Sequence, residues 1–113
     1  MKKLFILFAL TTAFAFKASA QSFDAQDFNA SLGKTRTLCD VVSSVKTFSD
    51  TLTLVNMGGN FPNQKYTIAV KGSEIKLDWA TLKGKTMCVT GVFELHKNRP
   101  EIVATKPEQI TIK

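Results

Sequence analysis

The 113-residue chain has few of the residues on which catalytic and metal sites depend, since it contains only two cysteines and one histidine. A structural zinc site takes four ligands, more than Cys39, Cys88 and His96 provide together. No serine or cysteine stands near His96 as a recognisable nucleophile, and the carboxylates show no paired acid–base spacing. The Gly58-Gly59 pair lacks the following helix of a phosphate-binding loop. We therefore expect no enzyme, no cofactor and no metal.

Long apolar runs are also scarce. The one candidate, Leu4 to Phe16, is shorter than the roughly 20 residues that a membrane-crossing helix needs. It follows the basic Lys2-Lys3 pair and precedes Ala18-Ser19-Ala20, which together are typical of a secretory signal peptide cleaved after Ala20. Because Gln21 rather than a cysteine follows, we expect no lipid anchor. The sequence thus predicts that residues 1–20 are a signal peptide and that the protein is exported, either periplasmic or secreted.

Acidic residues are the minority, and the whole chain has a formal net charge of +6. Removal of Lys2, Lys3 and Lys17 would reduce the 15 basic residues to 12, against 9 acidic residues, for a net charge of +3. That charge is compatible with binding nucleic acid or another polyanion but does not require it.

Both cysteines lie beyond the expected cleavage site. In an oxidising compartment an even pair forms a disulfide readily. A bridge between Cys39 and Cys88 would close a loop of about fifty residues and stabilise the fold by about 4 kcal/mol on the chain-entropy model.

Most of the remaining sequence has the composition of β-strands and is rich in threonine and valine. Gly72 to Leu82 differs, because Ile75, Trp79 and Leu82 follow helical spacing; we predict one short helix there, with Trp79 packed against the bottom of the sheet. Residues 21–31 are a lead-in or a short helix. The predicted strands are Thr35 to Lys46, Thr51 to Met57, Lys65 to Lys71, Thr86 to Lys97 and Glu101 to Thr105.

The resulting order is β-β-β-α-β-β, which predicts a mainly β domain over residues 32–113. This is the order of the OB-fold, a five-stranded, partly open Greek-key barrel. The main competitor, a split sheet-plus-helix fold, needs a second helix that the sequence does not offer. The alternation of apolar and polar residues agrees with the barrel. It places Cys39 and Cys88 on the outward face of two strands that would be antiparallel neighbours.

Three stretches carry a resemblance to a known family: TLCDVVSSVK, LVNMGGNFPNQKYTIAV and LKGKTMCVTGVFELHKNRPEIVATKPEQI. From Leu32 to Ile112 the chain resembles the single OB-fold domains of the tRNA-anticodon-binding-like superfamily found in secreted bacterial proteins. The resemblance implies the barrel and a nucleic-acid-binding role, with no chemistry attached. Two departures stand out: Asp40 and Lys71 replace a glycine and an aromatic residue, respectively, of the family pattern.

A groove is expected where OB-folds bind single strands, over strands two and three and the loops between strands 1–2 and 4–5. Aromatic side chains stack on bases in such grooves, and cations attract phosphates. Phe48 can serve as a stacking ring or cap the barrel end, and Phe61 can be a stacking ring or a packed loop anchor. The predicted groove residues are Lys46, Phe48, Phe61, Lys65, Thr67, Lys71, His96, Lys97 and Arg99.

Two functions fit this pattern. The first is an exported binding module that holds single-stranded nucleic acid or another extended anionic ligand weakly and with little sequence preference. The second is an envelope adaptor domain that binds a protein partner and no nucleic acid. The basic rim favours the first function, and the absence of an aromatic residue on the outer face of Lys65 to Lys71 favours the second.

Overall fold

The structure is a computed structural model that describes residues 22–113. The predicted signal peptide, residues 1–20, lies outside the described residues.

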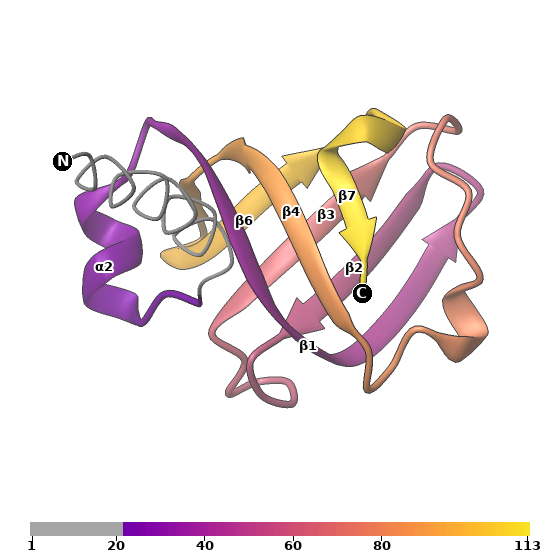
Figure 1. Ribbon diagram of the computed structural model, residues 1–113, viewed down its shortest axis with the longest axis horizontal. Coiled ribbons are helices and arrows are strands. Elements are labelled where there is room, and N and C mark those ends of the chain that lie inside the picture. Colours follow the sequence, from indigo (N-terminus) through magenta and orange to yellow (C-terminus); the bar gives the residue numbers. More distant parts are fainter. Residues whose placement is uncertain (1–21) are drawn as a thin grey trace, which may run out of the picture.

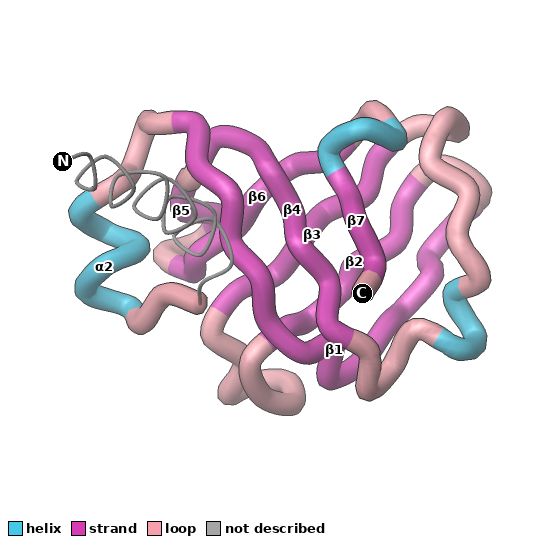
Figure 2. Tube along the Cα trace, viewed as in Figure 1, coloured by secondary structure: helices cyan, strands magenta, loops and turns pink. Residues whose placement is uncertain are grey.

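Strands dominate the described chain, so the predicted mainly β class is confirmed (Figures 1 and 2). They form one mixed sheet in the order β5-β6-β3-β2-β1-β4-β7. Neighbouring strands are antiparallel except for β3 and β6, which run parallel. The strands are β1 (Thr35–Ser49), β2 (Leu52–Met57), β3 (Tyr66–Lys71), β4 (Thr86–Val92), β5 (Glu94–His96), β6 (Arg99–Ala104) and β7 (Ile110–Ile112).

Residues 22–113 contain seven strands where the sequence predicts five, for two local reasons. Phe93 leaves the predicted strand Thr86 to Lys97 and divides it into β4 and β5, because its side chain is fully buried and its backbone bonds instead to Gly33 and Lys34. The tail after residue 109 adds β7 to the far side of β4. Because β5 and β7 are edge strands, the hydrogen-bonded ladder is open and is not a closed five-stranded barrel.

Strand β1 links the two halves of the sheet. Residues 35–41 pair with β4 and residues 42–49 pair with β2. The register shifts between Val42 and Ser44, and such a shift bends a strand and increases its twist. Ser43, at the shift, accepts a hydrogen bond of 2.8 Å from the backbone N–H of Gly59. The bend therefore carries β1 from its pairing with β4 to its pairing with β2, and the Ser43 hydrogen bond holds the loop after β2 against it.

The core follows the alternation of the strands, because successive side chains point to opposite faces. In β3 the predicted inward set is confirmed: Tyr66, Ile68 and Val70 are buried. Ala69, between them, is covered as well. The fully buried large side chains of the other strands are Leu38, Val42, Val55, Met57, Met87, Val89 and Ile102.

Strands β4 and β6 lie side by side without forming a ladder. Gly91 permits this approach, because a Cβ atom at that position would lie 2.6 Å from Cγ2 of Ile102. The side chain of Gln109 spans the seam: its Nε2 donates to the carbonyl oxygen of Thr90 at 2.9 Å and to that of Val103 at 3.3 Å. A single amide thus replaces part of the missing ladder.

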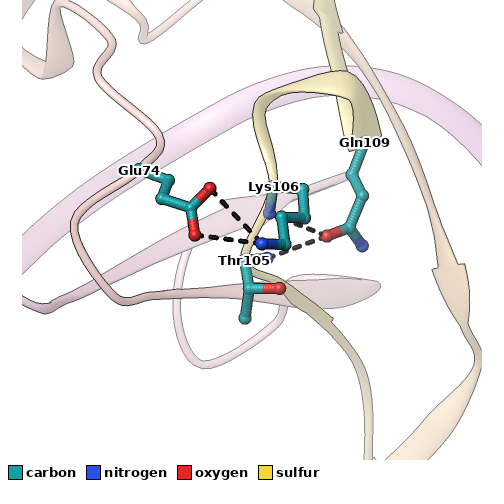
Figure 3. A network of polar contacts seen from close by, with 4 residues as sticks. All are labelled: Glu74, Thr105, Lys106 and Gln109. Atoms are coloured by element: carbon teal, nitrogen blue, oxygen red, sulfur yellow. Dashed lines mark hydrogen bonds and ion pairs between the residues drawn. The ribbon is translucent and has the colours of Figure 1, made fainter.

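The other end of the same amide fixes the turn before β7 (Figure 3). Gln109 Oε1 accepts from the backbone N–H groups of Thr105 and Lys106 at 2.9 and 3.0 Å. Lys106 in turn forms an exposed ion pair with Glu74, at 3.1 Å. This network ties the short 3₁₀ helix η3 (Pro107–Gln109) to the seam and to the segment after β3.

The N-terminal lead-in contains a short helix, α2 (Ala25–Ala30). A short helix is one of the two alternatives that the sequence offers for this segment. The Asp24 side chain caps it by accepting from the N–H of Asp27 at 2.8 Å. Phe28 stacks on Phe93 with ring centroids 4.2 Å apart, and Phe23 meets the edge of the same ring at 5.1 Å. The lead-in therefore closes one end of the sheet with aromatic side chains.

The prediction of one short helix over Gly72 to Leu82 is only partly correct, because the helix is limited to a single 3₁₀ turn. Residues 72–85 are irregular apart from the 3₁₀ helix η2 (Trp79–Thr81). Ile75 and Leu82 are buried and Trp79 is half-buried against the core. The helical spacing therefore reflects three anchor points of a loop, which crosses the end of the sheet opposite α2 (Figure 1).

The predicted disulfide is confirmed. Cys39 and Cys88 are directly paired residues of β1 and β4, and their sulfur atoms are bonded with a Cα–Cα distance of 4.0 Å. Each cysteine is only 8% exposed. A disulfide fits an oxidising compartment. Between residues 22 and 113 no helix has the length and apolar character to span a bilayer.

Candidate functional site

A cleft of about 760 Å³ lies on the outer face of the sheet. Strands β1, β2 and β3 supply its floor, and the β5–β6 hairpin and the loop between β2 and β3 supply its walls. The lining residues are Ser44, Val45, Lys46, Phe48, Leu54, Asn56, Phe61, Gln64, Thr67, His96, Lys97, Arg99, Pro100 and Glu101.

Strand parity explains the floor. The sequence leaves open which alternate residues of the second strand point inward; in β2, Thr53, Val55 and Met57 are the buried set. Leu54 and Asn56 consequently face outward and line the cleft. The register shift in β1 brings Ser44 opposite Asn56. The floor is therefore partly apolar and partly amide and hydroxyl.

Two aromatic rings flank the cleft. Phe61 is 68% exposed and Phe48 is 55% exposed, so neither is a packed anchor or a buried cap. The guanidinium carbon of Arg99 lies 5.5 Å from the centroid of the Phe61 ring, and Lys46 Nζ lies 5.5 Å from that of Phe48. Both are within the range of a cation–π attraction. Each ring thus carries a cation beside it at the rim.

The tip of the β5–β6 hairpin brings Lys97 and Arg99 to the wall of the cleft. His96 pairs with Arg99 across a two-residue turn of Lys97 and Asn98, whose φ angles are 54° and 67°. Positive φ at both central residues matches the twist of hairpin strands, and asparagine tolerates it well. A lysine does not, so Lys97 is held in a left-handed conformation at a cost in free energy.

Seven of the nine predicted groove residues come together in this cleft: Lys46, Phe48, Phe61, Thr67, His96, Lys97 and Arg99. The structure does not bring Lys65 and Lys71 to it. The stem of Lys65 lies against the backbone of Gly58, where a Cβ atom would be 3.0 Å away. Lys71 is at the far end of β3, opposite Leu52.

Half of the lining was not anticipated from the sequence: Ser44, Val45, Leu54, Asn56, Gln64, Pro100 and Glu101. If the sequence had shown that Val55 and Met57 point inward, the alternation of β2 would have placed Leu54 and Asn56 on the outer face. Glu101 carries the one carboxylate of the lining. It pairs with Thr67 on β3 and with Glu94 on β5. The cleft is therefore basic at its rim with a single acid in its wall.

A polar contact inside the fold supports the same strands. The Tyr66 hydroxyl accepts from the N–H of Phe23 at 3.2 Å and donates to Asp40 Oδ2 at 2.7 Å. Burial, and then the hydrogen bond to Asp40, raise the pKa of Tyr66 well above its ordinary value of 10.0. The hydroxyl thus remains neutral and couples the N-terminal lead-in to β1 and β3.

Among residues 22–113 no three histidine, cysteine, aspartate or glutamate side chains gather into a metal-binding group. No protein-family model matches the chain, and no curated protein matches it at a significant level. The physical character of the cleft is therefore the basis for assigning a function.

Proposed function

We propose that this protein is an exported OB-type binding module that holds single-stranded nucleic acid in the cleft between Phe48 and the β5–β6 hairpin. Export is supported by the signal-peptide pattern of residues 1–20 and by the Cys39–Cys88 disulfide. The proposal assigns the protein no catalytic step.

Three observations support the OB-type assignment, and with it the resemblance to the tRNA-anticodon-binding-like superfamily. Strand β1 pairs with both β2 and β4, β3 pairs in parallel with β6, and β4 lies beside β6 where an OB barrel would close. An OB barrel is itself only partly closed. On this reading β5 and β7 are additions to five principal strands.

The observation that carries the function is the pairing of exposed rings with cations on one outer face. Phe48 with Lys46, and Phe61 with Arg99, place a stacking surface next to a phosphate-attracting charge. Stacking of a base on an aromatic side chain contributes about 1–3 kcal/mol and tolerates any base. Lys and Arg add a salt-dependent attraction that carries no sequence information.

The test is fluorescence anisotropy of labelled single-stranded DNA and RNA across a salt series. Three permanent cations, Lys46, Lys97 and Arg99, line the cleft. If each neutralises one phosphate, the logarithm of the association constant falls with the logarithm of salt concentration with a slope of about −2. Neutralisation of two of them, in Lys97→Gln/Arg99→Gln, should make the slope shallower by about 1.4.

The matched control is Lys83→Gln/Lys85→Gln, which removes the same charge from two exposed residues that do not line the cleft. It should leave the slope nearly unchanged. Equal effects of the two double variants would mean that net charge, and not the cleft, drives binding. Absence of binding at low salt would refute the proposed function.

The exposed apolar surface at the cleft favours one alternative. Phe48 and Phe61 stand beside Leu54, Val45 and Pro100, an arrangement that also suits an apolar side chain of a protein partner. The adaptor function predicts a saturable complex with an envelope protein that survives high salt, together with no binding of oligonucleotides. A salt-insensitive complex that Phe61→Ala abolishes would establish this alternative.

A further inference from the structure

Four side chains form a continuous row of hydrogen bonds across the cleft floor. Gln64 Nε2 donates to Thr67 Oγ1 at 3.1 Å, and Thr67 Oγ1 donates to Asn56 Oδ1 at 2.9 Å. Asn56 Nδ2 then donates to Ser44 Oγ at 3.1 Å. All four residues line the cleft and come from the loop before β3, β3 itself, β2 and β1. The row therefore crosses the three floor strands from one side to the other.

The direction of the row leaves one atom unmet. Thr67 has a single hydroxyl hydrogen, which goes to Asn56, so Gln64 must present its NH₂ group to Thr67. Gln64 Oε1 is consequently left over, and among the described residues it is the buried side-chain oxygen that no hydrogen-bond donor reaches. A buried acceptor without a donor is costly, whereas a ligand N–H that met it would remove that cost.

Gln64 can turn this atom toward a ligand. The residue as a whole is half-buried, and the terminal torsion of a glutamine is broad and soft. In the bound state, rotation of the carboxamide about this torsion would present Oε1 to the cleft, next to the NH₂ hydrogen that Thr67 does not accept. A carboxamide in that position offers an acceptor beside a donor, the arrangement with which Asn and Gln recognise the edge of a base.

Resting on the proposed function, we infer that Gln64 reads the edge of a base bound between Phe48 and Phe61, and that the cleft prefers bases with an exocyclic amine beside a ring acceptor. Cytosine and adenine have that edge, and their amine donates to Gln64 Oε1. Uracil in the same pose sets its O4 oxygen against Gln64 Oε1, so oxygen faces oxygen. The N3–H of uracil would meet Oε1 only if the base shifted, because the Thr67 hydroxyl fixes which end of the carboxamide is the donor. The inference names the ligand as a nucleobase-bearing strand, because a polyanion without bases has no such edge.

The experiment compares labelled oligo(dC) and oligo(dU) of about eight nucleotides, within the usual site size of one OB-fold. The two strands have the same phosphates and similar flexibility and differ at the base edge. At pH 7.5 and low salt the wild-type protein should bind oligo(dC) at least about fivefold more tightly than oligo(dU). Gln64→Met, which keeps the volume and removes the amide, should bring this ratio to about one.

The matched control is Gln26→Met, which makes the same change at an exposed position of α2. It should preserve the wild-type ratio. A second variant, Thr67→Val, keeps Gln64 but removes the hydroxyl that orients it, and should reduce the ratio even if Gln64→Met folds poorly. Urea unfolding of each variant identifies poor folding.

The outcomes separate the two proposals. Equal binding of oligo(dC) and oligo(dU) by the wild-type protein would overturn the reading by Gln64 while leaving the binding function intact. A ratio that persists in Gln64→Met, or in Thr67→Val, would overturn it as well. Failure of the wild-type protein to bind either strand would refute the proposed function itself.

Discussion

At the scale of single residues, Lys97 combines a functional position with an unfavourable backbone conformation. Its φ of 54° lies in the left-handed region, which costs a residue with a side chain roughly 1–2 kcal/mol. Glycine adopts this conformation without that cost. Lys97→Gly should therefore raise the free energy of unfolding by about 1 kcal/mol while weakening oligonucleotide binding through the loss of one cation. Urea unfolding and anisotropy measured on the same sample provide the check.

Lys97→Asn is the matched control, because asparagine also tolerates a left-handed φ but, like glycine, has no charge. It should recover much of the stability gain and lose the same affinity. A glycine variant that is more stable and binds as tightly as the wild type would mean that Lys97 does not contact the ligand.

Tyr66 is the other residue whose effect can be isolated. Its hydroxyl bonds to Phe23 and Asp40, so Tyr66→Phe should lower the free energy of unfolding by about 1–3 kcal/mol. In the unfolded chain the pKa of Tyr66 is near 10. In the folded protein the pKa of Tyr66 is higher, because burial and then the hydrogen bond to Asp40 disfavour the phenolate. The contribution of the neutral hydroxyl is thus fully present below pH 10 and is lost as the pH rises above it.

The measurement is urea unfolding of the wild type and Tyr66→Phe from about pH 8 to pH 11. The stability difference between the two proteins should stay constant to about pH 10 and then shrink. All other ionisable groups are common to the two proteins, so their effect cancels in this difference. A difference that grows above pH 10 would contradict the burial of the Tyr66 hydroxyl.

At the scale of elements, the helix α2 covers one end of the sheet, and its packing there depends mainly on the side chain of Phe28. Phe28 is fully buried and stacks on Phe93. Truncation of a buried phenylalanine costs about 3–5 kcal/mol. Phe28→Ala should destabilise the protein by that amount in urea unfolding, whereas Gln26→Ala, on the exposed side of the same helix, should change stability by less than about 0.5 kcal/mol. Equal stability of the two variants would show that α2 does not pack on the sheet in solution.

The elements also separate what the sequence predicts from what it does not. Strands such as Tyr66–Lys71 are predictable because their large apolar side chains alternate along the sequence and point to the buried face. The segment 72–82 misleads, because three loop anchors happen to fall at helical spacing. The division of the fourth predicted strand depends on Phe93, whose burial against Phe28 is a contact between distant parts of the chain that local patterns do not contain.

The site shows the same division. Lys46, Lys97 and Arg99 were predictable, since charged residues on turns and outer faces are recognised from the pattern. The row of hydrogen bonds across the cleft floor was not predictable from the sequence. Gln64, Asn56 and Ser44 join this row only because of the register of three strands and the shift at Ser43. Lys65 and Lys71 are cations like those at the rim, but they do not line the cleft. Pairing register, and not composition, decides which residues share the cleft.

At the scale of the whole molecule, the disulfide bonds β1 to β4 in the half of the sheet that these two strands form. It links residues 49 apart in sequence, and most of its effect should lie in the unfolded chain, where closing such a loop removes about 4 kcal/mol of conformational freedom. Cys39→Ala/Cys88→Ala should therefore lower the free energy of unfolding by about 2–5 kcal/mol.

The slope of the urea transition distinguishes this cause from a loss of packing. Without the bridge the unfolded chain expands and exposes more surface, so the double variant should show a larger m-value than the wild type. Reduction of the wild-type protein should reproduce both the lower stability and the larger m-value, with no change of side chain. A loss of stability at constant m would instead assign the effect to the cavity left by two buried sulfur atoms. Two alkylatable thiols in unreduced exported protein would remove the bridge from the fold altogether.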